Sequence, residues 1–494
     1  MKPRFQVALI GSIAAAILLV AASARAIWPF TREPERPDPA VDLGGAAAGL
    51  LSEAIRVPTV NPPGSEGPLA KLFVDLLRDH GVEARLIETP RNGSEVGRAA
   101  AWARLPGSGN RRPVVLLSHL DVVPAEPPEW LVAPYEGVVA GGYVIGRGAL
   151  DAKGVTVVHL LALLELARRE RPLERDVIFL ATPDEETGGR AGAGFLASDR
   201  PELLHDAEYL LTEGGGILKG GGGAEPSVWG VAVSEKSPCW LRLVARGDSG
   251  HGSTATDDAA IPRLVRALER VGQLETELEV VPEVARMFES LAESAPPDDR
   301  FALRNLAFAL SADPGFRARF LAVPTQNALV RNTLAVTVLE GGSRTNVIPA
   351  RASAQIDARL LPGERCEDFA DALRESIPDR AVDLEILLSF EARSSPAETG
   401  LFDAIRRVAA EVDPGSLVVP RVIAGFTDAH YFRELGIVSY GFVPRWLEPA
   451  ESAAIHGPNE RISIENLERG VRTLVRILEE LDADGRGTVG AGAK

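Results

Sequence analysis

Short apolar runs alternate along the chain with longer segments of helical periodicity. The runs at residues 114–117, 176–181 and 207–212 contain few polar positions, which is typical of strands buried on both faces. Residues 69–80 repeat Leu and Phe at helical spacing, and residues 154–169 form a strongly apolar helical segment. Strands that alternate with helices in this way predict a three-layer αβα fold, in which helices cover both faces of a largely parallel sheet.

From residue 234 onward the pattern changes, because apolar and polar residues alternate within short runs. Such alternation is typical of strands with one solvated face. The order of the segments, βα…ββαβ, is that of a ferredoxin-like α+β sandwich. The segments are residues 239–247 (strand), 260–271 (helix), 334–339 and 352–360 (strands), 366–377 (helix) and 382–390 (strand). We therefore expect an inserted ferredoxin-like domain that is interrupted by a helical insertion at about residues 274–321.

The α/β pattern resumes near residue 394, so one domain is inserted within another. Residues 27–42 are rich in Pro and charge and are typical of a linker. The predicted divisions are an α/β domain in two parts (residues 43–233 and 394–481), the inserted domain (234–393) and a Gly/Ala-rich tail (482–494) that we expect to be disordered.

The first 26 residues have the pattern of an export signal. Lys2 and Arg4 precede an apolar run at residues 7–24, and the tripeptide at 24–26 (ARA) fits the small-residue rule for cleavage. The run is also long enough to span a bilayer uncleaved as an N-terminal membrane anchor. Either alternative predicts an exported protein that is periplasmic, extracellular, or membrane-anchored and facing away from the cytoplasm.

The composition permits large cores and excludes some partners. Of the 494 residues, 45% are hydrophobic and 25% are charged, which is the composition of a chain that is mostly folded rather than disordered. The net charge of −16 and the lack of a basic cluster argue against a nucleic-acid partner. The two cysteines, Cys239 and Cys366, exclude a cysteine zinc site, and the sequence leaves open whether they form a disulfide or stay free.

Residues of metal-ligating types follow the predicted buried strands. His119 and Asp121 lie two positions apart after the first strand, so in extended chain they point the same way. This suits a metal ligand and the group that orients it, although a polar loop after a strand would look the same. Asp184-Glu185-Glu186 follows the next strand. Three adjacent carboxylates need a cation or a shifted pKa if they are enclosed, and otherwise form a solvated acidic loop.

Asp151, Glu213 and His456 are further candidates. Asp151 stands before the helix at 154–169, where this residue type often caps a helix, although its two oxygens could also bridge two cations. Glu213 precedes a Gly-rich run that lacks the GK[ST] of a phosphate-binding loop, so we reject that interpretation. His456 lies in a Gly/Pro turn, which is a poor core position, so it is either exposed or a ligand.

Ligands of open α/β sheets bind outside the carboxyl ends of the strands, which is a physical reason to place His119, Asp184-Glu185-Glu186 and Glu213 in one crevice. Two imidazoles and three carboxylates suit two zinc-class ions that share one carboxylate. A water between the ions would ionise near neutral pH and could attack a carbonyl, with a neighbouring Glu as general base. The expected ligands are His119, Asp151, Glu186, Glu213 and His456, and the expected base is Glu185.

Several motifs occur in the order of a known family. They are SHLDVVP, GRGALDAKG, the Glu185-Glu186 pair, Glu213-Gly214-Gly215 and HGPNE. In these motifs the chain resembles the co-catalytic zinc peptidase family of carboxypeptidase S, glutamate carboxypeptidase and the aminoacylases. The spacer at residues 130–137 (WLVAPYEG) is similar to the carboxypeptidase S branch, which includes exported N-acyl-amino-acid hydrolase and synthase relatives. The resemblance covers roughly residues 43–481.

The resemblance implies roles for the individual residues. One Zn²⁺ would be held by His119 and Glu213 and the other by Glu186 and His456, with Asp151 as the bridge; Co²⁺ or Mn²⁺ could replace zinc. Asp121 would orient His119, and Glu185 would be the base.

The inserted domain would be a lid that binds substrate and forms a homodimer. His251, which by itself is more typical of a plain loop residue, resembles the lid histidine that stabilises the oxyanion, often from the partner subunit. Asn346 would reach the scissile carbonyl. Arg359, which alone could pair with any surface acid, would clamp a substrate carboxylate. Thr427 lies in GFTD, which resembles a Gly-rich substrate loop, with Phe426 where relatives often have a second glycine.

We therefore expect an exported di-zinc hydrolase that cleaves the amide next to a free carboxylate in small peptides or N-acyl amino acids. Glu rather than Asp at position 213 resembles the carboxypeptidase and aminoacylase side of the family. An exported peptide- or metal-binding protein that keeps the fold without turnover is the alternative. A structural or adhesion protein is a third candidate, but it would not need these clustered ligands.

Overall fold

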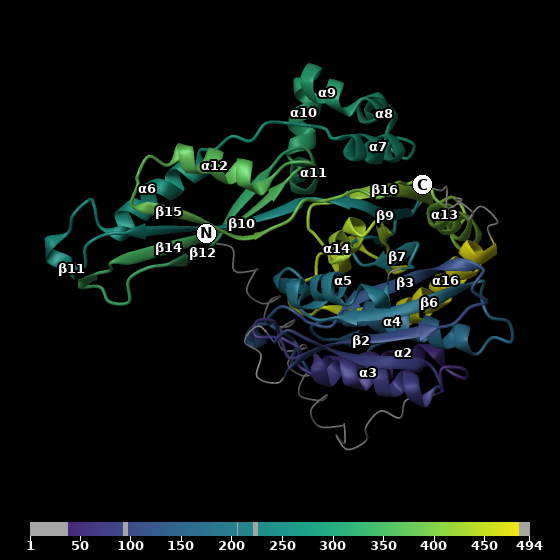
Figure 1. Ribbon diagram of the computed structural model, residues 1–494. Coiled ribbons are helices and arrows are strands. Elements are labelled where there is room, and N and C mark those ends of the chain that lie inside the picture. The colour runs from purple at the N-terminus through teal and green to yellow at the C-terminus, as the bar shows by residue number, and fades with distance from the viewer. Residues whose placement is uncertain (1–37, 92–96, 205, 221–225, 484–494) are drawn as a thin grey trace, which may run out of the picture.

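The computed structural model describes residues 38–91, 97–204, 206–220 and 226–483 (Figure 1). The predicted export segment at residues 1–26 lies outside the described residues, as do most of the predicted linker and nearly all of the predicted tail. Within the described ranges no helix is both long enough and apolar enough to cross a membrane.

A mixed sheet forms the centre of the larger body, with the strand order β1-β2-β6-β3-β7-β17-β9-β8-β18 and with β16 paired to β9. Its strands are β1 (Glu83–Thr89), β2 (Arg98–Leu105), β3 (Arg111–His119), β6 (Arg175–Thr182), β7 (Tyr209–Thr212), β8 (Gly216–Leu218), β9 (Val228–Glu235), β16 (Leu417–Ile423), β17 (Val438–Gly441) and β18 (Trp446–Leu447). The central pairs β6–β3, β3–β7 and β7–β17 are parallel, as expected. The pairs β1–β2 and β8–β9 are antiparallel, because their short connections leave no room for a crossover helix.

Helices cover both faces of this sheet and give three layers. Along β3, Val114 and Leu116 belong to one core, while Val115 and Leu117 belong to another. The first core includes α2 (Leu43–Arg56), α3 (Gly67–Asp79), α4 (Lys153–Ala167), α13 (Gly400–Val412) and α16 (Ile464–Ala483), and the second includes α5 (Phe195–Asp199) and α14 (Ala429–Glu434). Successive side chains of a strand point to opposite faces, so β3 is buried on both sides, as its apolar run predicts.

The second body, which we call the lid, is an antiparallel sheet of order β12-β14-β10-β15. Its strands are β10 (Ser237–Arg246), β12 (Thr333–Glu340), β14 (Arg351–Leu360) and β15 (Val382–Ser389). Helices α6 (Ala260–Gly272) and α12 (Cys366–Ser376) pack on one face. This is the expected ferredoxin-like order, and the fold class is confirmed. In Figure 1 the lid extends away from the larger body.

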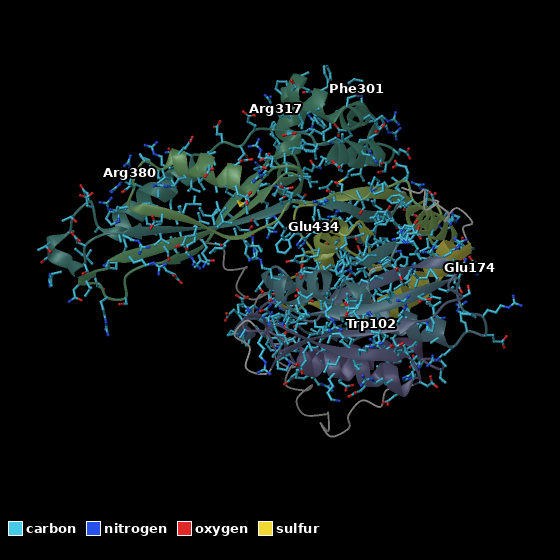
Figure 2. All side chains as sticks on the ribbon, in the orientation of Figure 1. Trp102, Glu174, Phe301, Arg317, Arg380 and Glu434 are labelled. Atoms are coloured by element: carbon cyan, nitrogen blue, oxygen red, sulfur yellow. A yellow bond between two sulfur atoms is a disulfide. The ribbon has the colours of Figure 1, made fainter. Side chains whose placement is uncertain are left out.

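A bundle of short helices interrupts the lid and rests on the larger body. It comprises α7 (Pro282–Leu291), α8 (Pro297–Arg304), α9 (Leu306–Ala312), α10 (Pro314–Leu321) and α11 (Pro324–Leu329). Its core contains Phe288 and Phe320 together with Val422 of β16. Phe301 lies on its outer side and is 66% exposed (Figure 2). The helices continue past the predicted end at residue 321, because α11 also packs into this core through Leu329.

The structure settles the state of the two cysteines. Cys239 on β10 and Cys366 at the start of α12 form a disulfide within the lid, across 127 positions of sequence. The bond joins a strand to the helix that packs on it, so it closes a long loop at the centre of the lid core.

Replacing both cysteines by Ala should lower the free energy of unfolding of the lid by about 2–4 kcal/mol, because the unfolded chain regains the entropy that the closed loop removes. Urea unfolding followed by circular dichroism measures the change. Thiol titration of the denatured, unreduced wild-type protein should find no free thiol, and two thiols per chain would contradict the bond.

Candidate active site and metal centre

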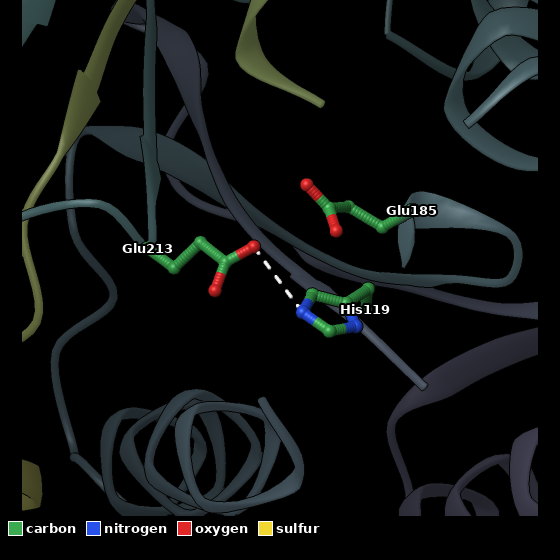
Figure 3. A group of neighbouring side chains, drawn as sticks. All are labelled: His119, Glu185 and Glu213. Carbon is green, nitrogen blue, oxygen red and sulfur yellow. Dashed lines mark ion pairs between the residues drawn. The ribbon is translucent and has the colours of Figure 1, made fainter. Parts of the chain in front are cut away.

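The site lies where neighbouring parallel strands of the central sheet end. β3 ends at His119, which pairs in register with Thr182 at the end of β6. Glu185 follows β6 in a short helical turn, and Glu213 follows β7 directly. Because β3 pairs in parallel with both β6 and β7, the sheet itself brings these three side chains to one edge. Figure 3 shows Glu185 and Glu213 converging on the His119 ring.

Asp151 stands between two histidines. Its Oδ1 lies 3.0 Å from Nε2 of His119, and its Oδ2 lies 3.1 Å from Nε2 of His456. Glu213 Oε1 is 3.2 Å from the same nitrogen of His119, and Glu186 Oε1 is 3.3 Å from that of His456. All five ligand candidates therefore meet, as two His–Glu pairs with one carboxylate between them.

The His119 ring is aimed as a metal ligand would be. Its Nδ1 lies 3.0 Å from the backbone oxygen of Asp121, which can only accept a hydrogen bond. Nδ1 therefore carries the proton, and Nε2 of the neutral ring presents a lone pair. That lone pair faces carboxylate oxygens of Asp151 and Glu213, which are also acceptors. Acceptors in such contact repel unless a proton or a cation lies between them, and this mixed N/O donor set fits zinc-class ions.

The electrostatics of the cluster agree with this geometry. Burial, reinforced by Glu213, raises the pKa of Glu185 well above its ordinary value. Burial also raises the pKa of Glu213 to about 7, against the lowering effect of His119. Burial alone would lower the pKa of His119, but the Glu213 carboxylate and hydrogen bonds to Asp121 and Asp151 raise it. Groups shifted in this way hold protons or cations strongly, as ligands of divalent ions do.

Glu185 lies at the wall of a cavity of about 430 Å³ that adjoins the ligand cluster. One of its carboxylate oxygens lies within 4.8 Å of ligand atoms on His119 and Glu213. Its side chain is buried, and burial is the first cause of its raised pKa. A buried carboxylate beside both the ligands and the cavity is placed to exchange a proton with a bound molecule.

Asp121 connects the His119 ring to the acidic turn. Its carboxylate lies 3.4 Å from Nδ1 of His119 and accepts hydrogen bonds from the backbone N–H groups of Glu185 (3.2 Å) and Glu186 (3.0 Å). Asn61 donates to the same carboxylate at 2.8 Å. Asp121 can therefore orient the ring, as proposed from the sequence, and it also fixes the turn that carries two functional side chains.

A buried network lies behind this turn, and apart from Asp184 of the acidic run no sequence motif marks its members. Arg98 forms an ion pair with Asp184, and its Nη2 donates to Oδ1 of Asn61 at 2.6 Å. Asp184 has a left-handed backbone (φ 81°), and its carboxylate also accepts from the N–H of Ala191 at 2.8 Å. These side chains hold an otherwise unfavourable turn in place.

Glu460 fixes the loop that carries Asp151. Its Oε1 accepts from the backbone N–H groups of Leu150 (2.6 Å) and Asp151 (3.1 Å). Its Oε2 accepts from the N–H of Gly148 (3.1 Å) and from Nη1 of Arg147 (2.7 Å). Glu460 is fully buried and ends the HGPNE motif, so the motif itself was the signal that could have assigned it this role.

Arg359 and Thr427 line the same cavity. Arg359 donates through Nε and Nη2 to Asp357 at 2.6 and 3.0 Å, and its guanidinium lies 4.8 Å from the ring centroid of Phe426. The Thr427 hydroxyl donates to the buried Glu235 at 3.1 Å, so this hydroxyl has a structural partner within the protein. The phenyl ring that replaces the expected glycine at position 426 is thus a platform for Arg359.

The structure does not bring His251 and Asn346 to this cavity. Both are exposed, and they lie together where β11 (Gly250–His251) pairs with β13 (Val347–Ile348) at the far end of the lid (Figure 1). Among the described residues, Nδ1 of His251 contacts Ser253, whose hydroxyl lies at 2.8 Å and whose backbone N–H donates to it at 3.2 Å. Their substrate-binding roles stay predictions, and they require another subunit or a large movement of the lid.

The fold and the ligand cluster, together with a matching family model, define the class of the protein as a hydrolase of the metallopeptidase type. The chain belongs to peptidase family M20/M25/M40, whose family model matches residues 115–480, and this confirms the family predicted from the motifs.

Three known proteins illustrate the similarity. The chain is 32% identical over 453 residues to an N-fatty-acyl-amino acid synthase/hydrolase of Xenopus tropicalis, covering 88% of this chain and 85% of that protein. It is 27% identical over 447 residues to aminoacylase-1 of Sus scrofa, covering 87% and 94% of the two chains. Its fold matches the crystal structure of a metallo-carboxypeptidase from Sulfolobus solfataricus with a TM-score of 0.69 at 19% identity, covering 89% of this chain and 99% of the other.

Replacing His119 by Ala should reduce the bound divalent metal from about two ions per chain to about one or fewer, because the substitution removes one of the two imidazoles of the ligand set. Metal analysis of the purified, dialysed protein measures the stoichiometry. His80→Ala, which removes a histidine from a distant helix end, should keep the wild-type content. An unchanged stoichiometry in His119→Ala would contradict the metal site.

Proposed function

We propose that this protein is an exported di-zinc hydrolase that cleaves the amide next to a free carboxylate in small peptides or N-acyl amino acids. The observation that carries the proposal is Asp151, whose two oxygens face the Nε2 atoms of His119 and His456. A side chain placed in this way suits a carboxylate shared by two cations.

The ligand set divides into two halves. His119 with Glu213 and His456 with Glu186 would each hold one ion, and Asp151 would serve both. Two ions bound there would polarise a scissile carbonyl and make an attacking water more acidic. Zinc suits this mixture of imidazole and carboxylate, and Co²⁺ or Mn²⁺ would fit the same donors.

Glu185 would act as the general base and then as the acid. Its burial raises its pKa, so the carboxylate can accept a proton from water and return it to the departing amine. Asp121 holds the backbone of Glu185 in place, which keeps the base at a fixed distance from the ligands.

The proposed substrates follow from the names of the relatives and from the cavity. The relatives are named for N-fatty-acyl amino acids, acyl amino acids and carboxypeptidase activity. Arg359 at the cavity wall is suited to a substrate carboxylate, since a guanidinium can bind it through two hydrogen bonds. The cavity also has an apolar side formed by Ile217, Leu218 and Leu447, which suits an acyl chain or an apolar side chain.

An exported peptide- or metal-binding protein without turnover remains the alternative function. Glu185 argues against it, because binding alone does not require a buried carboxylate of raised pKa next to the ligands. The export segment and its use as a membrane anchor are part of the proposal and rest on the sequence of residues 1–26.

Replacing Glu185 by Gln should leave the zinc content unchanged and lower kcat on N-acyl amino acids by at least about 100-fold, because the amide cannot accept the proton. Glu185→Ala should behave in the same way. Glu269→Gln on the exposed side of α6 is the matched control and should keep full activity. Turnover retained by both Glu185 variants would exclude this residue as the base.

His251 would act on the site of a partner subunit, because it lies at the far end of the lid in its own chain. The protein should therefore elute as a dimer in size-exclusion chromatography with light scattering. Mixing His251→Ala with Glu185→Gln chains should restore part of the activity that each variant lacks. A fully active monomer would contradict the role in trans.

A further inference from the structure

Arg421 is a cavity residue that the proposed mechanism does not use. It lies on β16 and lines the cavity together with Ile423, while Val422 between them points into the core of the helical bundle. A Cβ atom at Gly230 on the neighbouring strand β9 would lie 3.3 Å from Cδ of Arg421, so the glycine leaves room for the arginine stem. Val422 thus anchors β16 in the core of the helical bundle on one face, and Arg421 faces the cavity on the other.

The arginines of the cavity differ in how they are paired. Arg359 is held by the Asp357 carboxylate, and Arg445 donates to the backbone oxygen of Leu150. Within the part of the chain that the structure describes, the guanidinium of Arg421 has neither an ion pair nor a hydrogen bond. Burial is the only cause that lowers its pKa, which agrees with a guanidinium removed from water without a protein partner.

The acids of the cavity do not supply that partner. The carboxylates that line it are Asp151, Glu185, Glu186 and Glu213, which form the ligand cluster and its base. A half-buried guanidinium without an anion is unfavourable, and a bound carboxylate would satisfy it through two parallel hydrogen bonds.

Between the ligand cluster and Arg421 the cavity is lined by three consecutive glycines, which have no side chains to fill it. Glu213 is followed by Gly214, Gly215 and Gly216, which all line the cavity. A Cβ atom at Gly214 would lie 3.1 Å from Cδ1 of Ile423, two positions from Arg421 on the same strand. A small substrate at the ligand cluster can therefore extend toward β16.

We infer that Arg421 forms a second carboxylate subsite, which binds a carboxylate of the substrate other than the one that faces Arg359. The inference rests on the proposed function and narrows it to substrates that carry two carboxylates. The second carboxylate belongs either to an acidic side chain of the amino acid or to the far end of a dicarboxylic acyl group, and the same guanidinium suits both.

Matched substrate pairs distinguish the two sources. The first pair is N-acetyl-glutamate and N-acetyl-glutamine, and the second is N-succinyl-leucine and N-butyryl-leucine. In the zinc-loaded wild-type protein, kcat/KM should favour the acidic member of one pair by at least about 10-fold, since hydrogen bonds between charged groups are strong.

Arg421→Gln should abolish this preference and change kcat/KM for the neutral members by less than about 3-fold, because their carboxylate does not depend on Arg421. Arg380→Gln, on the outer surface of the lid (Figure 2), is the matched control and should keep the preference. A wild-type protein that favours neither acidic substrate, or an Arg421→Gln variant that loses activity equally on both members, would overturn the subsite.

A binding measurement separates this result from the proposed function. Glutarate should raise the midpoint of thermal unfolding of the wild-type protein more than butyrate does, and the difference should vanish in Arg421→Gln. If no substrate is cleaved but this difference is present, the proposed function fails and the subsite stands. If neutral substrates are cleaved and the two acids act alike, the function stands and the subsite fails.

Discussion

The concentration of buried negative charge at one edge of the sheet is the constraint on which the rest of the structure depends. Asp151, Glu186 and Glu213 meet around two imidazoles, and Glu185 lies beside them. Carboxylates this close repel one another and are costly to remove from water, so the arrangement persists only with protons or cations between them. The surrounding structure must therefore supply rigid positions for groups that would otherwise separate. The parallel strand ends provide part of that rigidity, because they fix where three of the ligand-bearing loops begin.

Buried hydrogen bonds to the backbone provide the remainder. Two of the loops that carry the site are each held by an acid that is not itself a proposed ligand. Asp121 accepts from two N–H groups of the turn after β6, and Glu460 accepts from three N–H groups of the loop around Asp151. In both cases a carboxylate satisfies several backbone donors at once, which restricts the loop more than a single hydrogen bond would. On the lid side of the cavity a supporting residue likewise holds a functional one, because the ring of Phe426 packs against the guanidinium of Arg359.

The sequence predicts those parts of the fold that have a periodic pattern. The apolar run of β3 predicts a strand with two buried faces, and the ligand candidates could be proposed because each follows such a strand or lies in a recognisable motif. The supporting residues Asn61 and Arg98 could not be identified, because single polar residues show neither periodicity nor spacing. The sequence could not decide whether the two cysteines form a disulfide, since their pairing depends on how α12 packs on β10. The sequence also could not place His251 relative to the site, because that depends on the position of the lid.

The disulfide of the lid has a consequence for the covalent connectivity of the molecule. The ring closed by Cys239 and Cys366 contains the whole helical bundle, from α7 to α11, as well as the lid tip with His251 and Asn346. A protease that cuts the chain once between α6 and α7 therefore yields two fragments that stay covalently joined. Such nicked protein would migrate as one band in a non-reducing gel and as two bands after reduction. A single cut anywhere between Cys239 and Cys366 thus leaves the two fragments joined by the disulfide.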